Sequence, residues 1–261
     1  MINDISIYRK INIKEEGMRF ELNFELKHLE IPKDNQSIWI SFLKKAISNV
    51  NQGKYFERYF SGTNTKDYTF SIILVKPRFL GDKIQLAGNQ IKMIFSADDR
   101  NKSGLIFFDA FIRQKHKVFY LPNGNELVLK NVNILRERLI TSNKVLFRTM
   151  TGSGFVVREH NRETNKDKFY TVEDVGFKEE AKRVLTLQAK NAGFSDAIAE
   201  NIIITPIRCK KILAKQYGIY VDATIGIIQI EADEDLLQYF YQAGAGSRSS
   251  AFGMLDIVAQ G

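Results

Sequence analysis

The sequence is poor in the residues that build disulfides and metal centres. Its 261 residues include one cysteine, Cys209, and three histidines, His28, His116 and His160. A single cysteine forms no intramolecular disulfide and excludes a cysteine-built zinc module. No H-E-x-x-H motif and no close pair of histidines is present. We therefore expect neither a metal site nor a bound cofactor.

Long apolar runs are also lacking. No stretch approaches the roughly 18 apolar residues that cross a bilayer. Charged residues interrupt the first 17 positions, where a secretion signal would need an apolar core. We therefore expect a cytoplasmic protein with no membrane partner. The composition, 44% hydrophobic and 26% charged, is that of a globular chain and excludes wholesale disorder.

Negative charge is in deficit. The chain has 38 Lys and Arg against 30 Asp and Glu, which gives a formal net charge of +8, and its isoelectric point is near 9.4. A polyanion is the expected partner of such a chain, and nucleic acid is the commonest polyanion. A solvated basic surface explains the charge equally well at this stage.

Hydrophobic periodicity in the first half of the chain predicts alternating strands and helices. In residues 18–30, Phe20, Leu22, Phe24 and Leu26 share one face, which is typical of a half-buried strand. The later predictions are a helix capped by Ser37, a short helical turn over 54–60, strands over 68–75 and 90–96, a helix over 105–114 and a strand over 126–138 with one slip in phase. The order β-α-β-β-α-β is that of a ferredoxin-like unit.

The second half repeats this order of elements without visible sequence repetition. The predicted elements are strands over 144–150, 154–158 and 168–172, a helix over 178–191, strands over 201–216 and 217–231, a helix over 235–242 and a strand over 252–258. We predict an α+β protein of two tandem ferredoxin-like (βαββαβ) domains, residues 18–141 and 142–261. Residues 1–17 form an N-terminal extension to which we assign no function.

The sharpest local motif is the segment Gly244-Ala-Gly-Ser-Arg-Ser-Ser-Ala-Phe-Gly253. Glycines permit positive φ angles, and successive N–H groups can form a concave anion site, to which Arg248 would add charge. The segment is neither a Walker A loop nor a G-x-G-x-x-G motif. A helix C-cap followed by a turn explains the same glycines without a ligand. An unrelated α+β enzyme that binds a nucleotide in this loop is a further alternative.

Together with three other segments, this motif resembles the CRISPR-associated repeat-processing endoribonucleases, the Cas-six family of the RAMP superfamily. The other segments are Met18-Arg19-Phe20, Asp67-Tyr-Thr-Phe-Ser71 and Thr151-Gly-Ser-Gly-Phe-Val-Val157. The resemblance covers about residues 18 to 258. It implies two ferredoxin-like domains that bind the CRISPR repeat in precursor RNA. It also implies metal-independent cleavage, in which a 2′-hydroxyl attacks the neighbouring phosphate and leaves 2′,3′-cyclic phosphate and 5′-hydroxyl ends.

Such chemistry needs a base, an acid and a cation at the phosphate. Members resembling this chain commonly carry a histidine about nine residues before the threonine of the second strand. Here that spacing reaches Phe60, and no histidine lies between positions 29 and 115. The lysine often found just before that threonine matches Lys66. The catalytic candidates are Lys66 for charge stabilisation, Tyr59 or Tyr55 as acid or base, and Lys44 and His160 as alternatives.

Basic residues gather in a predicted hairpin and a predicted strand of the second half. The candidate RNA-binding residues are Gly244, Gly246, Arg248, Ser249 and Gly253 of the glycine-rich loop, Arg158, Arg162, Lys166 and Lys168 of the hairpin, and Arg208, Lys210 and Lys211 of the strand. Alternation also places Arg136 and Arg138 on one strand face. If about six such residues contact phosphates, log affinity should fall with log salt with a slope of about −4 to −5.

The missing histidine supports a second interpretation, a non-catalytic repeat RNA-binding protein or a subunit of a CRISPR effector complex. On either interpretation the resemblance implies precursor and mature CRISPR RNA as partners. It leaves open an association with effector-complex proteins and a homodimer.

Overall fold

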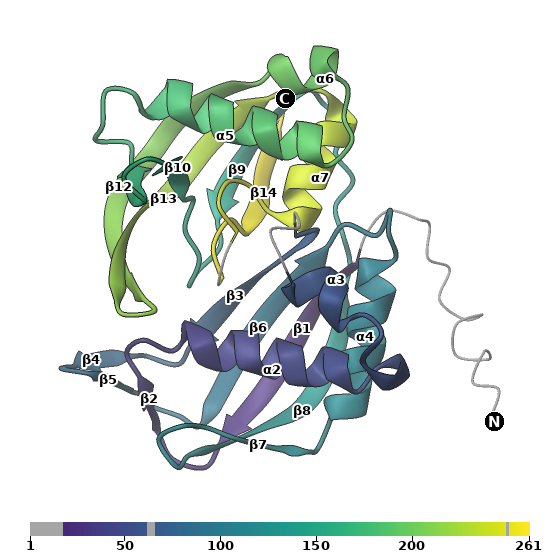
Figure 1. Ribbon diagram of the computed structural model, residues 1–261, viewed down its shortest axis with the longest axis vertical. Helices are drawn as coiled ribbons and strands as arrows, with labels where there is room; N and C mark the ends of the chain where they lie inside the picture. Colours follow the sequence, from purple (N-terminus) through teal and green to yellow (C-terminus); the bar gives the residue numbers. More distant parts are fainter. Residues whose placement is uncertain (1–17, 62–65, 249–250) are drawn as a thin grey trace.

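The structure, a computed structural model, describes residues 18–61, 66–248 and 251–261. The predicted N-terminal extension and the candidate Ser249 lie outside the described residues. Figure 1 shows two α/β units stacked along the long axis, with the N-terminal half below the C-terminal half. No helix in the described ranges is long and apolar enough to span a membrane.

The N-terminal half is an antiparallel sheet with the helices α2 and α4 packed on one face (Figure 1). Its strand order is β3-β6-β1-β8-β7, so the first strand pairs with the third and last strands of the βαββαβ unit. A small sheet, β2-β5-β4, is added at one end; its three-residue strands are too short for periodicity to predict. The elements are β1 (Met18–Leu26), β2 (Glu30–Pro32), α2 (Gln36–Ser48), η1 (Asn51–Gly53), α3 (Phe56–Phe60), β3 (Tyr68–Leu74), β4 (Arg78–Leu80), β5 (Lys83–Gln85), β6 (Gln90–Ala97), α4 (Ser103–Gln114), β7 (Val118–Tyr120) and β8 (Glu126–Leu135).

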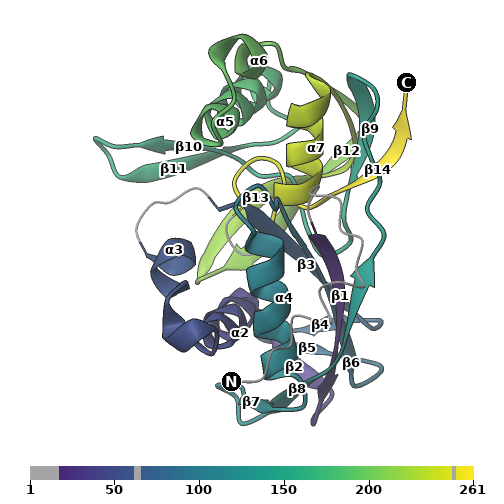
Figure 2. The same ribbon diagram turned by 90° about the vertical axis from the view of Figure 1, so that its right-hand side faces the viewer.

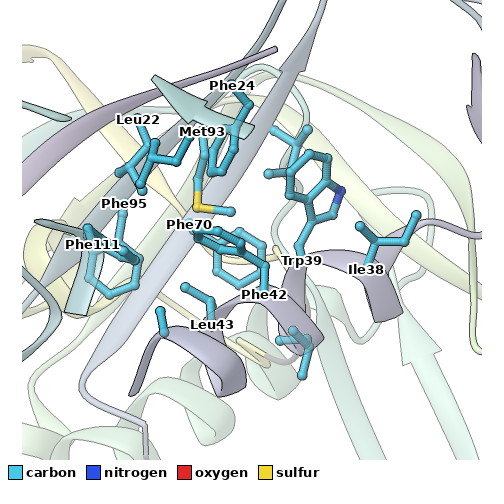
Figure 3. Close-up of a cluster of buried hydrophobic side chains, with 14 of the residues drawn as sticks. Leu22, Phe24, Ile38, Trp39, Phe42, Leu43, Phe70, Met93, Phe95 and Phe111 are labelled. Carbon is cyan, nitrogen blue, oxygen red and sulfur yellow. The ribbon is translucent and has the colours of Figure 1, made fainter. Parts of the chain in front are cut away.

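The predicted alternation of β1 is confirmed by the core. Phe20, Leu22 and Phe24 are buried, and they pack against α2 and α4 through aromatic contacts such as Phe24 on Phe42, with ring centres 4.9 Å apart. Figure 3 shows these rings interleaved with leucine, isoleucine and methionine side chains. Burying each such side chain contributes about 1.5–3 kcal/mol, so this core fixes the helices over the sheet.

The start of α2 differs from the prediction. The residue before the helix is Asn35, not Ser37, and the helix begins at Gln36. The Asn35 side chain does not cap the helix; its Oδ1 accepts a 2.8 Å hydrogen bond from Nε1 of the buried Trp39. A buried indole N–H needs such a partner, and this tertiary demand decides where the helix starts.

The C-terminal half has the same topology. Its sheet order is β12-β13-β9-β14, and α5 lies over the sheet in Figure 1. The hairpin β10–β11 is inserted after the first strand and projects from this half in Figure 2. The elements are β9 (Lys144–Thr149), β10 (Val157–Asn161), β11 (Lys166–Tyr170), α5 (Phe177–Asn191), α6 (Asp196–Glu200), β12 (Ile203–Gln216), β13 (Ile219–Glu231), α7 (Glu234–Ala243) and β14 (Leu255–Gln260). The predicted fold class is confirmed.

The phase slip in β8 is a β-bulge, because the pairing of β1 with β8 shifts between Asn23 and Phe24. The strand ends at Leu135, so the prediction that Arg136 and Arg138 share a strand face is wrong. Arg138 instead donates a hydrogen bond to the carbonyl of Ile257 on β14. The connection between the two halves thus runs beside the last strand.

Arg19 of β1 joins the two halves. Its side chain is buried, and its guanidinium donates to the Tyr241 hydroxyl at 3.0 Å, to the Tyr241 carbonyl at 3.2 Å and to the Leu255 carbonyl at 2.8 Å. A buried charge is tolerated when it is hydrogen-bonded in this way. The division into domains at 141/142 remains a prediction, and the two sheets contact each other directly at this arginine.

Candidate functional site

A pocket of about 320 Å³ opens where four segments meet: the chain before β3, the start of β10, one face of α5 and the glycine-rich loop after α7. Four of its lining side chains are positively charged, namely Lys66, Arg158, Arg183 and Arg248. The remaining lining residues are Val184, Leu187, Gln188, Asn191, Gly246 and Ser247. This lining, which contains no carboxylate among the described residues, suits an anion.

Lys66 is half-buried and lies two residues before β3. Burial lowers the pKa of Lys66, and the positive charges of Arg248 and Lys44 lower it further. Lys44 is exposed on α2, with its Nζ 5.7 Å from the centre of the Phe60 ring. The structure therefore brings three of the predicted residues into one electrostatic cluster, in which a bound anion would relieve the mutual repulsion.

Neutral groups hold Arg248 in place. Its Nη1 donates to the hydroxyl of Tyr239 at 3.3 Å and to the carbonyl of Ala243 at 3.1 Å. The Tyr239 ring also lies 4.9 Å from the guanidinium of Arg100, a residue of the N-terminal half. Because no carboxylate pairs with Arg248 in the described part of the chain, its charge is available to a ligand.

The glycines of the loop serve close packing. Gly244, Gly246 and Gly253 all have positive φ angles, near +80°. A Cβ on Gly244 would lie 2.8 Å from Cβ of Thr69, and one on Gly246 would lie 2.6 Å from the carbonyl oxygen of Val156. Side chains at these positions would clash, so only glycine fits between the loop and its neighbours.

The expectation of an anion site made of open backbone N–H groups is wrong for the described part of the loop. The N–H groups of Ala245, Ser247 and Gly253 donate to protein carbonyls at 2.8–2.9 Å. The N–H of Gly246 donates to Oε1 of Gln188 at 2.9 Å, and Nε2 of the same glutamine donates to the Gly244 carbonyl at 2.7 Å. The loop therefore presents Arg248 to the pocket, while these four amides bind the protein itself.

Arg158 and His160 of the hairpin share one carboxylate. Asp167 lies 2.8 Å from Nε of Arg158 and 2.8 Å from Nδ1 of His160. Arg158 lines the pocket, whereas His160 does not. His160 therefore lies outside this pocket lining, and its role as an acid or in RNA contact stays a prediction.

Arg183 is a candidate that sequence reasoning missed. It lies on α5, where Glu180, one turn earlier, accepts a hydrogen bond from its Nε at 2.8 Å. That i,i+3 pair looks like an ordinary solvated ion pair in the sequence. Only the packing of the glycine-rich loop beside α5 reveals that Arg183 lines the same pocket as Arg248 and Lys66.

The placement of Tyr59 argues against its predicted role as acid or base. Its side chain is 5% exposed, and its hydroxyl lies 2.8 Å from Oγ of Ser103. Burial raises the pKa of Tyr59 to about 12. A phenol enclosed in the core and holding its proton so firmly cannot reach an RNA phosphate.

The other predicted residues lie outside the pocket lining. Tyr55 is half-buried against the N-terminal core. The remaining hairpin and strand candidates, Arg162, Lys166, Lys168, Arg208, Lys210 and Lys211, are exposed. Lys168 stacks on Tyr170, with its Nζ 4.3 Å from the ring centre, and Lys211 pairs with Asp222 at 2.8 Å. These side chains can meet a long ligand beyond the pocket, and that role stays a prediction.

A larger cavity, of about 670 Å³, lies at the far end of the C-terminal half and is lined by Glu231, Asp233, Glu234 and Asp235. It has the wrong charge for a polyanion. Within the described ranges, no group of three or more His, Cys, Asp or Glu side chains is placed to hold a metal ion.

Comparison with known families matches residues 135–257 to the model "CRISPR associated protein Cas6, C-terminal". The C-terminal half of the chain is therefore similar to the C-terminal part of Cas6 proteins over this range. The family resemblance seen in the sequence is thereby confirmed, and the match includes the α5 wall, the hairpin and the glycine-rich loop of the pocket. A search of curated proteins found no match.

Solved structures of Cas6-type proteins share the whole fold. The product of a Cas6-related gene from Pyrococcus furiosus is 18% identical with a TM-score of 0.77, and it covers 94% of this chain and 100% of that chain. An RAMP protein described as binding different RNA substrates is 17% identical, with a TM-score of 0.75 and coverage of 93% and 100%. A Cas6 product complex is 10% identical, with a TM-score of 0.67 and coverage of 93% and 100%. At these identities the likeness establishes the double ferredoxin-like fold.

Proposed function

We propose that this protein binds the CRISPR repeat in precursor RNA and cleaves it as a metal-independent endoribonuclease. The observation that carries the proposal is the cluster of Lys44, Lys66 and Arg248, three cations from three segments that no carboxylate neutralises within the described residues. The Cas6 match over residues 135–257 supports the choice of RNA as the anion.

In the proposed reaction the 2′-hydroxyl of one nucleotide loses its proton to solvent water and its oxygen attacks the adjacent phosphorus. The bond from phosphorus to the 5′-oxygen breaks, and that oxygen takes up a proton from the ammonium group of Lys66, which solvent then protonates again. The products are a 2′,3′-cyclic phosphate and a 5′-hydroxyl. Negative charge develops on the phosphoryl oxygens in the transition state, where fixed cations are most effective.

The three cations divide this work. Lys66, whose pKa is lowered by burial and by neighbouring charge, exchanges a proton more readily near neutral pH than an ordinary lysine does. Arg248 offers a planar guanidinium, held by Tyr239 and Ala243, to the phosphoryl oxygens. Lys44 adds charge from α2. Arg158 and the exposed basic residues of the hairpin contact flanking phosphates.

A non-catalytic repeat RNA-binding protein, or an effector-complex subunit, is the second candidate. It is favoured by the ring of Phe60, which lies beside Lys44 at the position where similar chains carry a histidine. The burial of Tyr59 removes one substitute for that histidine. On this candidate the same cations bind RNA but transfer no proton.

One assay separates the two. The protein is incubated in EDTA with its cognate repeat RNA and with the same RNA carrying a single 2′-deoxy nucleotide at the cleavage site. We expect cleavage of the all-ribose RNA alone and a cyclic phosphate end. Tight binding without cleavage of either RNA would identify the non-catalytic binder. Binding that does not weaken with salt would contradict phosphate recognition altogether.

The proposal extends to the cellular setting. We infer that the protein is cytoplasmic. After cleavage it either keeps the mature RNA or transfers it to proteins of a CRISPR effector complex. A homodimer is a further assembly that we consider. Co-purification with tagged effector proteins, and the mass of the free protein in light scattering, test these two associations separately.

A further inference from the structure

One wall of the pocket is a ridge on α5. Arg183, Leu187 and Asn191 follow each other at i, i+4 and i+8, so they lie on one face of the helix. Leu187 is 52% exposed. All residues of α5 are among those that the structure describes, and no other large apolar side chain of this helix is exposed. The ridge thus runs from a cation through an apolar surface to a carboxamide.

The carboxamide of Asn191 is available. The other amide in the pocket, Gln188, uses its Nε2 and its Oε1 to hold the glycine-rich loop, at 2.7 and 2.9 Å. Asn191 is exposed at the last residue of α5, and its side chain has no hydrogen-bond partner in the described ranges. It can therefore offer a donor and an acceptor side by side to a ligand.

The volume limits the ligand. About 320 Å³ lies at the small end of ligand pockets, which span about 300–1,000 Å³. A duplex does not fit, whereas one unstacked nucleotide does. Single-stranded RNA is commonly recognised by such splayed bases, which bind through their edges while their faces rest on side chains.

Resting on the proposed RNA function, we propose that this pocket receives one adenine nucleotide of single-stranded RNA. Its phosphate lies against Arg183 and Arg248, its base covers Leu187, and the Asn191 carboxamide binds the adenine edge. Adenine presents an amino donor beside a ring-nitrogen acceptor, the pair that an asparagine amide complements with two hydrogen bonds. Asn191 is on this view a specificity-determining residue next to the cation cluster.

The test uses fluorescein-labelled decamers of adenylate, cytidylate and uridylate, with dissociation constants measured by fluorescence anisotropy at one fixed low salt concentration. The variants are Asn191→Ala, Arg248→Ala and, as a matched control, Asn131→Ala, which removes an exposed asparagine from β8 in the other half. Circular dichroism confirms that each variant is folded.

We expect the wild type to bind oligoadenylate about tenfold more tightly than the two pyrimidine decamers, as one bidentate amide contact allows. Asn191→Ala should abolish this preference and leave pyrimidine binding within about twofold, and Asn131→Ala should change nothing. The inference is overturned if Asn191→Ala still prefers oligoadenylate. It is also overturned if the wild type prefers a pyrimidine decamer and Asn191→Ala removes that preference. If all decamers bind equally and Arg248→Ala weakens them alike, only the base assignment fails. If no decamer binds, the inference fails, and binding of the cognate repeat RNA in the same assay then shows whether the proposed RNA function survives.

Discussion

The positive charges around the pocket are of two kinds. Arg158 and Arg183, from the C-terminal half, are each paired with a carboxylate, Asp167 and Glu180. Lys44, Lys66 and Arg248 have no such partner among the described residues. Burial lowers the pKa of Lys66, and the positive charges of Arg248 and Lys44 lower it further. Paired arginines are oriented but partly neutralised, whereas the unpaired cluster gains most when a phosphate arrives. The catalytic and affinity-determining charge is therefore expected where the chain before β3 meets the glycine-rich loop.

The largest effect is expected from Lys66→Met, which removes the charge and keeps the length of the side chain. Cleavage of repeat RNA should slow by about 100-fold, the lower end of the loss expected when a group that transfers a proton and stabilises transition-state charge is removed. Single-turnover rates measure this. Lys45→Met, which removes an exposed charge next to Lys44 on α2, is the matched control. Equal losses in both variants would show that only total charge matters.

A pH titration of RNA binding should show a smaller effect of the same residue. The pKa of Lys66 is lowered in the free protein, so as pH rises this lysine loses its proton before ordinary lysines do. Affinity should therefore fall as pH rises through that lowered pKa, by up to about tenfold, since a charge-assisted contact is lost. Anisotropy measurements across pH should show this fall in the wild type. The same fall in Lys66→Met would assign it to another group.

Asp167→Asn should strengthen RNA binding by up to about fivefold. The change frees the guanidinium of Arg158 and the imidazole of His160 from their shared carboxylate, and the salt dependence should steepen by about one phosphate contact. Asp109→Asn removes a carboxylate that pairs with Arg113 at 2.9 Å on α4, and it controls for net charge. Weaker binding in Asp167→Asn would mean that the carboxylate positions Arg158 for the RNA.

The smallest change in activity is expected from Tyr59→Phe. Cleavage should stay within about twofold of the wild type, because the hydroxyl is buried and bonded to Ser103. The free energy of unfolding should fall by about 1 kcal/mol for the lost hydrogen bond, which urea denaturation measures. A large loss of cleavage at unchanged stability would show that this tyrosine, and not the lysine cluster, transfers the proton.

Much of the fold was predictable because its signals are local. The alternation in β1 and the spacing of apolar residues in α2, α4 and α5 indicate which faces are buried. Gly193, which the sequence predicts as the stop of this last helix, follows shortly after its end at Asn191 and has a positive φ. Asn35 shows where prediction from local signals fails. Its side chain accepts a hydrogen bond from Trp39 and does not cap the helix, and no local sequence signal distinguishes these two roles.

The candidate site was predictable in part. Lys66, Lys44, Arg158 and Arg248 carry a family signal or a charge pattern, and the structure gathers them. Arg183 was missed, since an ion pair with Glu180 looks the same whether or not a loop packs beside it. Tyr59 was chosen by its position in the sequence, which does not reveal that its ring faces the core.

The basic charge, the order of the elements, the glycine-rich loop and the absence of a histidine from positions 29–115 can all be read from the amino-acid sequence. These are properties of composition and short-range periodicity. The packing of the glycines and the grouping of the cations around one pocket follow only from the folded arrangement. The reason is that close packing, burial and electrostatic repulsion depend on distances between residues such as Lys66 and Arg248, which stand far apart along the chain.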